Sequence, residues 1–236
     1  MKHRATALTV HVPDSGDDVE ALLLRPDNAR WLLIFAHGAG AGMQHSFMES
    51  LARELADCSV ATLRYQFPYM QHRRGRPDVP AVLTATVRAA VTTASELASD
   101  LPLLAGGKSL GGRMTSLACA QEGSAIKADT TRLRGLVFFG FPLHPPGRPD
   151  TKRADHLTRV QLPMLFLQGT RDTLADLALL RPLCATLGPR ATLHVVDTAD
   201  HSFHVLKRSG KRDADVLNEV ARTLASWADS LEEDRR

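Results

Sequence analysis

One stretch decides the fold of this chain: Leu103-Leu104-Ala105-Gly106-Gly107-Lys108-Ser109-Leu110-Gly111-Gly112. It contains Gly107-x-Ser109-x-Gly111, the pattern of a nucleophile elbow, in which a serine stands on a tight turn between a buried strand and a helix. The glycines leave room for close neighbours, and the turn raises the hydroxyl above the edge of the sheet. The stretch predicts a strand over 101–105 and a helix from Leu110 to about Gln121.

The triplet Gly107-Lys108-Ser109 also occurs in phosphate-binding loops, which offers a second interpretation. That motif requires a glycine five residues before Gly107, where this chain has Pro102. Because proline has no backbone N–H for a phosphate cradle, the sequence argues against a nucleotide site. Matches to the five-residue serine pattern also arise by chance. Whether Ser109 is a nucleophile therefore depends on which other residues the chain supplies.

Composition narrows the class of protein. The chain has 236 residues, of which 44% are hydrophobic, and we expect one domain over 1–236. A net charge of +3 is too balanced to indicate a nucleic-acid or membrane partner. Cys58, Cys119 and Cys184 are widely spaced, as expected of buried thiols in a reducing compartment, and no long apolar run is present. We therefore expect a cytoplasmic protein with no metal and no organic cofactor.

Strand and helix patterns alternate along the chain. The expected strands cover 5–12, 19–24, 31–36, 60–65, 101–105, 133–140, 162–168 and 191–196. One expected helix begins after an N-cap at Ser46, and a second, long helix starts near Leu83 and ends near Ser99. Further helices are expected over 110–121, 173–187 and 213–231, and a polar loop over 123–131. The first two strands suit an antiparallel hairpin on one edge. The alternation predicts the α/β class: a doubly wound, mostly parallel sheet with helices on both faces.

A serine nucleophile needs a base, and the base needs a carboxylate that orients it. In a doubly wound sheet these groups lie beyond the carboxyl ends of the strands. Asp172 follows the strand expected over 162–168, and His201 follows the strand expected over 191–196. The chain order Ser109, Asp172, His201 is that of a known type of catalytic triad. The alternative is that Asp172 has no catalytic role and serves as the N-cap of the helix that follows it.

Other residues compete for the same roles. Asp197 and Asp200 are rival acids, but both lie so close to His201 in sequence that an acid on a separate loop reaches its Nδ1 better. His204 is a rival base, and His201-x-x-His204 resembles half of a metal site that no nearby carboxylate or cysteine completes. His37 is interpreted as a side chain that holds the glycine-rich loop 37–42 in place.

The oxyanion hole should use backbone N–H groups of Leu110 and of Ala39, with Gly40 as the alternative to Ala39. The side chains expected to line the pocket are apolar or aromatic: Tyr69, Met70, Phe141, Leu143 and Phe203. The arginines of 73–76 are interpreted as a solvated loop; the alternative is that they attract an anionic substrate. The connection 141–161 is too short to form a cap domain.

The motifs resemble those of the α/β-hydrolase superfamily from about Trp31 onward. Its pattern is matched by His37-Gly38, the serine elbow, Gly169-x-x-Asp172 and Asp200-His201-Ser202-Phe203. The uncapped size resembles dienelactone-hydrolase-like enzymes, which typically carry a cysteine where this chain has Ser109, and this departure weakens the case for a lactone substrate. A narrower resemblance, to the group of testis-expressed protein 30 and the third subunit of the non-specific lethal complex, lies in 64–69, 107–114 and 140–146.

Together, these motifs predict a serine hydrolase that acts through an acyl-enzyme on small to medium carboxylic esters or thioesters. The alternative is a non-catalytic protein-interaction module on the same fold, which would dock through the proline-rich stretch 141–149 or the arginine loop. The presence of Ser109, Asp172 and His201 on three separate loops favours the enzyme, because an interaction module has no physical need for these three residues.

Overall fold

The computed structural model describes residues 4–121 and 132–233. Its described residues form one eight-stranded sheet in the order β1-β2-β4-β3-β5-β6-β7-β8. The strands are β1 (Thr6–Val12), β2 (Asp17–Leu24), β3 (Trp31–Ala36), β4 (Val60–Tyr65), β5 (Leu103–Lys108), β6 (Leu133–Phe139), β7 (Met164–Gly169) and β8 (Ala191–Val196). β2 pairs antiparallel with β1 and β4, and all other neighbours are parallel. The predicted edge hairpin and mostly parallel sheet are confirmed.

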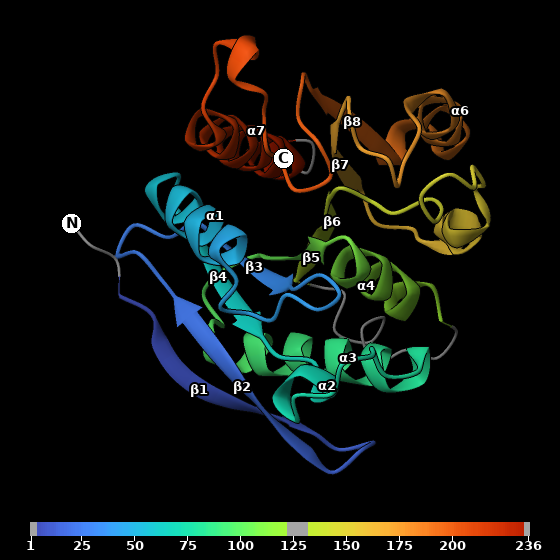
Figure 1. Ribbon diagram of the computed structural model, residues 1–236. Coiled ribbons are helices and arrows are strands. Elements are labelled where there is room, and N and C mark those ends of the chain that lie inside the picture. The colour runs from blue at the N-terminus through green and yellow to red at the C-terminus, as the bar shows by residue number, and fades with distance from the viewer. Residues whose placement is uncertain (1–3, 122–131, 234–236) are drawn as a thin grey trace.

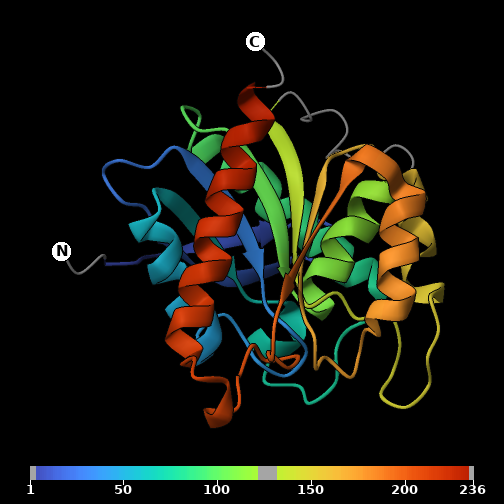
Figure 2. The ribbon, with the colours of Figure 1, turned by 90° about the horizontal axis from the view of Figure 1, so that it is seen from above.

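Helices cover both faces of the sheet (Figure 1). α1 (Ser46–Asp57) and α7 (Asp213–Glu233) lie on one face, and α7 crosses in front of the strands in Figure 2. α3 (Pro80–Leu97), α4 (Leu110–Ala120) and α6 (Leu177–Leu187) lie on the other face, with the 3₁₀ segment η1 (Lys152–Arg159). The doubly wound arrangement predicted from the sequence is therefore confirmed.

Strand β3 shows why the sheet needs two helical layers. All six of its residues are buried. Leu33 and Phe35 belong to the core under α1 and α7, whereas Leu32 and Ile34 belong to the core under α3 and α4. Since successive side chains of a strand point to opposite faces, a continuous apolar run must be covered on both sides.

The strand before Ser109 differs from the prediction. It starts at Leu103 and continues to Lys108, so that Gly106 and Gly107 lie within the strand and not after it. A Cβ on Gly106 would lie 1.9 Å from the carbonyl oxygen of Val137 on the neighbouring strand. Glycine here permits close strand packing directly below the serine.

Two helix starts also differ from the prediction. The N-cap of α1 is His45, whose side chain accepts a hydrogen bond from Phe47 N, and Ser46 is the first helical residue. α6 begins at Leu177 and not at Thr173, because Asp176 caps it by accepting from Ala178 N. The segment between β4 and α3, which includes the arginines of 73–76, contains the short helix α2 (Pro68–Gln71). The polar loop expected over 123–131 lies outside the described residues.

Candidate active site

Ser109 stands at the junction of β5 and α4 with a φ of +50°. This left-handed conformation is uncommon for a residue with a side chain and is held by the tight packing around it. A Cβ on Gly107 would lie 2.4 Å from Ala36 O, and one on Gly111 would lie 2.5 Å from the same oxygen. The elbow therefore requires both glycines, because β3 passes directly beneath it.

Ser109, His201 and Asp172 come together from three loops. Ser109 Oγ lies 2.9 Å from His201 Nε2, and His201 Nδ1 lies 2.7 Å from Asp172 Oδ2. The Asp172 side chain has no exposed surface, whereas that of His201 is 23% exposed. A carboxylate can only accept, so Nδ1 carries the proton and the lone pair of Nε2 faces the serine hydroxyl. This is the arrangement of a general base.

Asp172 is fixed by further hydrogen bonds. Gln168 Nε2 donates to its Oδ2 at 2.5 Å, and Leu174 N donates to its Oδ1 at 2.8 Å. Gln168 is fully buried and also accepts from Phe141 N at 3.1 Å. The carboxylate therefore has one orientation, with Oδ2 towards His201.

The loops that carry the acid and the histidine are joined to each other. Arg171 N donates to Ala199 O at 2.9 Å, and the Arg171 guanidinium donates to Thr198 O. A Cβ on Gly169 would lie 2.3 Å from Ala199 O. Glycine at the end of β7 thus lets the His201 loop lie against the Asp172 loop.

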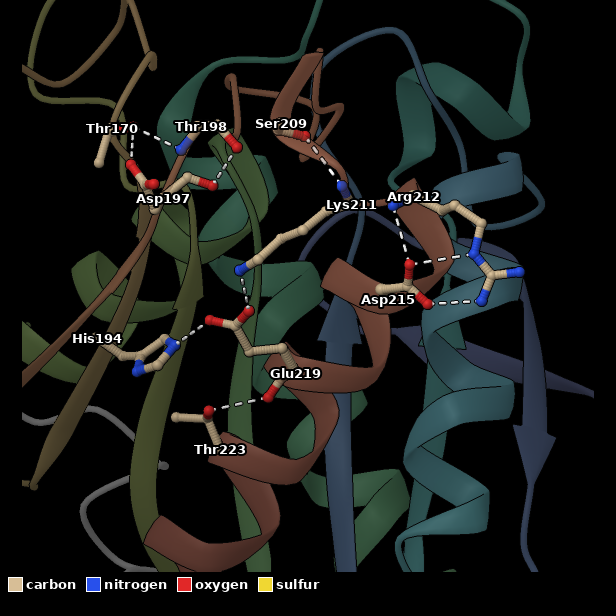
Figure 3. A network of polar contacts seen from close by, with 10 residues as sticks. All are labelled: Thr170, His194, Asp197, Thr198, Ser209, Lys211, Arg212, Asp215, Glu219 and Thr223. Atoms are coloured by element: carbon tan, nitrogen blue, oxygen red, sulfur yellow. Dashed lines mark hydrogen bonds and ion pairs between the residues drawn. The ribbon is translucent and has the colours of Figure 1, made fainter. Parts of the chain in front are cut away.

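The rival acids and the rival base have other partners. Asp197 lies beside Thr170 and Thr198 at the end of β8 and accepts from the Thr170 hydroxyl at 3.5 Å (Figure 3). Asp200 Oδ1 accepts from Ser202 N and His204 N, so this carboxylate holds the turn that contains His201. His204 Nδ1 lies 2.6 Å from Asp213 Oδ2. Of the residues weighed from the sequence, only Asp172 accepts from His201.

Neither Leu110 N nor Ala39 N donates to a partner in the described part of the chain. Leu110 directly follows Ser109, and Ala39 lines the same cavity as Ser109. Gly40 N donates to the Tyr69 hydroxyl at 3.2 Å, so the alternative donor is already occupied. This geometry favours Ala39 over Gly40 as the second oxyanion donor.

His37 supports the loop that contains Ala39. Its Nε2 accepts from Phe67 N at 3.1 Å, so the proton lies on Nδ1 and is donated to Gly38 O at 2.8 Å. Burial lowers the pKa of His37 to about 4. The side chain is a neutral tie between the loop after β3 and the segment before α2, as its sequence position indicated.

A cavity of about 830 Å³ opens at Ser109 and lies beside the first turns of α1 and α7. Its wall includes Ser109, His201 and Lys108, together with residues of the glycine-rich loop 37–42. The two helices contribute further side chains, among them Phe47, Arg53, Asp213 and Leu217. The position beside α1 and α7 was not predicted, because no local pattern records which helices border a loop.

The structure corrects the expected pocket lining. Phe203 belongs to the cavity wall, as expected. Tyr69, Phe141 and Leu143 are buried in the core on the face covered by α3 and α4, and Met70 packs against that core. Their aromatic or aliphatic character therefore reflects packing. In the arginine loop, Arg74 pairs with Asp78 at 3.0 Å, and this loop also lies outside the cavity wall.

Three residues near the site were missed by sequence reasoning: Lys108, Gly140 and Gln168. Gly140 has a φ of +70°, which favours glycine, and a Cβ there would lie within 3.3 Å of Asp172 Oδ2, His201 Nδ1 and Lys108 Nζ. The available signals were a polar residue at the end of an apolar strand, for Lys108 and Gln168, and a glycine directly after β6.

Comparison with known proteins now identifies the class. A family model described as "Alpha/beta hydrolase domain" matches residues 29–229, and the chain belongs to this family. It has the α/β-hydrolase fold without an evident cap, and this membership supports a hydrolase.

Solved structures agree on the fold. A dienelactone hydrolase from Anabaena variabilis is 20% identical, with 96% of this chain and 97% of that chain covered and a TM-score of 0.74. A serine hydrolase without a lid from Xanthomonas campestris is 22% identical, with 96% of both chains covered and a TM-score of 0.71. The esterase domain of a Rhodothermus marinus protein is 18% identical, with 95% of this chain and 98% of that chain covered and a TM-score of 0.68.

No helix within 4–121 and 132–233 is both long enough and apolar enough to cross a bilayer. The expected cytoplasmic location stays a prediction.

Proposed function

We propose that this protein is a serine hydrolase that cleaves carboxylic esters or thioesters through an acyl-enzyme on Ser109. The observation that carries the proposal is the continuous chain of hydrogen bonds from Ser109 Oγ through His201 to the buried Asp172, with Ser109 and His201 in the wall of a cavity. Family membership supports the reaction class.

The geometry supports a specific sequence of proton transfers. His201 Nε2 takes the hydroxyl proton as Ser109 Oγ attacks the carbonyl carbon, and Asp172 stabilises the imidazolium that forms. The oxyanion of the tetrahedral intermediate accepts from the N–H groups of Leu110 and Ala39. His201 then gives its proton to the leaving alcohol or thiol. Water repeats these steps in the second half-reaction and releases the acid.

The cavity supports substrates of small to medium size. Phe47, Phe203 and Leu217 contribute apolar surface to its wall, and α1 and α7 border it. Asn218 Nδ2 of α7 donates to Glu54 Oε2 of α1 at 2.9 Å, which joins the two helices on the side of the cavity that Glu54 lines. We therefore expect the acyl chain to lie beside the first turns of these helices.

We also propose that the protein is related to the group of testis-expressed protein 30 and the third subunit of the non-specific lethal complex. Three stretches, 64–69, 107–114 and 140–146, resemble that group.

Labelling with a fluorophosphonate probe tests the proposal, since the probe reacts with activated serines. The purified protein should be labelled, and Ser109→Ala should not be, whereas Ser116→Ala should be labelled like the parent. Esters of two to ten acyl carbons then define the preferred chain length. If the folded parent protein is not labelled, the serine-hydrolase proposal fails and the interaction module becomes the better explanation.

A further inference from the structure

Lys108 is a buried cation beside the proposed active site. It ends β5 directly before Ser109, and its stem passes the loop after β3, where a Cβ on Gly38 would lie 3.4 Å from Lys108 Cγ. The residue is only 9% exposed, and its Nζ has no hydrogen-bond partner in the described part of the chain. A buried ammonium in such a position needs compensation from other charges or from aromatic rings.

Two aromatic rings and the His201–Asp172 pair surround the ammonium. Nζ lies 5.9 Å from the ring centre of Phe47 and 5.8 Å from that of Phe203. Nζ, Asp172 Oδ2 and His201 Nδ1 all lie within 3.3 Å of the point that a Cβ on Gly140 would occupy. The amine therefore lies near the contact between the Asp172 carboxylate and His201 Nδ1.

The charged neighbours come from several elements. The carboxylates of Asp172, after β7, and Asp200, after β8, favour the charged amine. The other titratable groups that line the same cavity are His45, Arg53 and Glu54 around α1, and His201, His204 and Asp213 around the start of α7. Burial outweighs the carboxylates and lowers the pKa of Lys108 to about 8.

We propose that Lys108 is a positioning residue whose ammonium serves as the resident counter-ion of the Asp172 carboxylate and balances its charge beside His201. The inference rests on the proposed function. A general base must be neutral before it accepts a proton, so in the resting enzyme His201 supplies no charge to balance the buried carboxylate. An uncompensated buried charge is costly, and Lys108 supplies the missing positive charge. Because the Nζ atom itself is enclosed, this role requires no contact between the ammonium and the substrate.

The test compares Lys108→Met with Lys152→Met, which removes the same charge from a side chain that is 84% exposed. With a neutral ester, Lys108→Met should lower kcat about tenfold and leave KM unchanged. The parent's kcat should fall above pH 8, as the amine loses its proton, and approach that of Lys108→Met, whose profile should lack this fall. Lys152→Met should match the parent throughout.

Two other variants keep the proposal testable if Lys108→Met does not fold. Lys108→Arg retains its charge at high pH, so it should keep kcat and lose the alkaline fall. Phe47→Leu removes one ring that stabilises the ammonium, so the fall should begin at lower pH.

An unchanged kcat and pH profile in Lys108→Met would overturn the proposal. A rise in KM confined to esters with a carboxylate would also overturn it, because Lys108 would then bind substrate directly. In either case, activity that still depends on Ser109 leaves the serine-hydrolase proposal intact. Loss of that dependence contradicts the proposed function itself.

Discussion

Two serine–histidine pairs in this molecule have similar contact distances and very different surroundings. Ser109 Oγ lies 2.9 Å from His201 Nε2, and Ser116 Oγ lies 2.7 Å from His156 Nε2. The first pair is at the cavity, whereas the second is buried between α4 and η1. A hydroxyl next to an imidazole is therefore not enough to define a site.

The protons of the two pairs are arranged differently. His201 donates from Nδ1 to Asp172, which leaves the Nε2 lone pair for Ser109. The Ser116 hydroxyl donates to Arg113 O at 3.0 Å, so its oxygen accepts from Nε2–H of His156. In the second pair the imidazole is a donor to the serine and cannot act as its base.

The charges nearby also differ. A carboxylate accompanies His201, whereas the charged groups that act on His156 are Arg113 and Arg159. Burial, with these two arginines, lowers the pKa of His156 to about 4. An imidazolium is disfavoured there, so the second pair suits packing and the first suits proton transfer.

Replacement of His201 or of His156 should give the largest difference in activity between the two serine–histidine pairs. His201→Gln should lower ester turnover by roughly 10⁴ to 10⁶, the range for loss of a triad base, while His156→Gln should keep turnover within a few-fold. Initial rates with a short-chain ester measure both, and circular dichroism checks that the variants fold. Equal losses in the two variants would contradict this assignment of roles.

Removing the acid tests the next difference. Asp172→Asn should lower kcat by about 10⁴, because an amide favours the wrong histidine tautomer. Asp197→Asn should have little effect, since Asp197 contacts Thr170 and not His201. Steady-state kinetics of both variants decide between them, and the reverse outcome would make Asp197 the acid.

The buried pair should appear in stability as a function of pH. His156 has a pKa of about 4 in the folded protein against an ordinary 6.5, so the unfolded chain binds its proton first as pH falls. Its contribution is fully present above pH 6.5 and is lost towards pH 4, by up to about 3 kcal/mol. His37 acts in the same direction.

Urea unfolding of the parent and of His156→Gln between pH 4 and 7 measures this effect. The variant should show a shallower dependence of the free energy of unfolding on pH, with the slope from His37 remaining. A slope identical to that of the parent would show that His156 titrates alike in the folded and unfolded states, and it would remove this distinction between the pairs.

Local sequence determined much of the fold and three proposed catalytic positions. Alternating apolar strands and amphipathic helices define the layers, because backbone periodicity decides which side chains face a core. The glycines around Ser109 mark the elbow, because close backbone approach excludes side chains. The strand-end positions of Asp172 and His201 follow from the parallel sheet, whose carboxyl ends share one edge.

Only the tertiary structure decided which polar groups meet. Ser116 and His156 are 40 residues apart, and no motif relates them. Tyr69 was expected in the pocket, but it lies in the core, where its hydroxyl accepts a hydrogen bond from Gly40 N. The same holds for Lys108, because its burial depends on rings contributed by α1 and by the loop after β8. Periodicity fixes the direction of a side chain from its own element, but its partners depend on how distant elements pack.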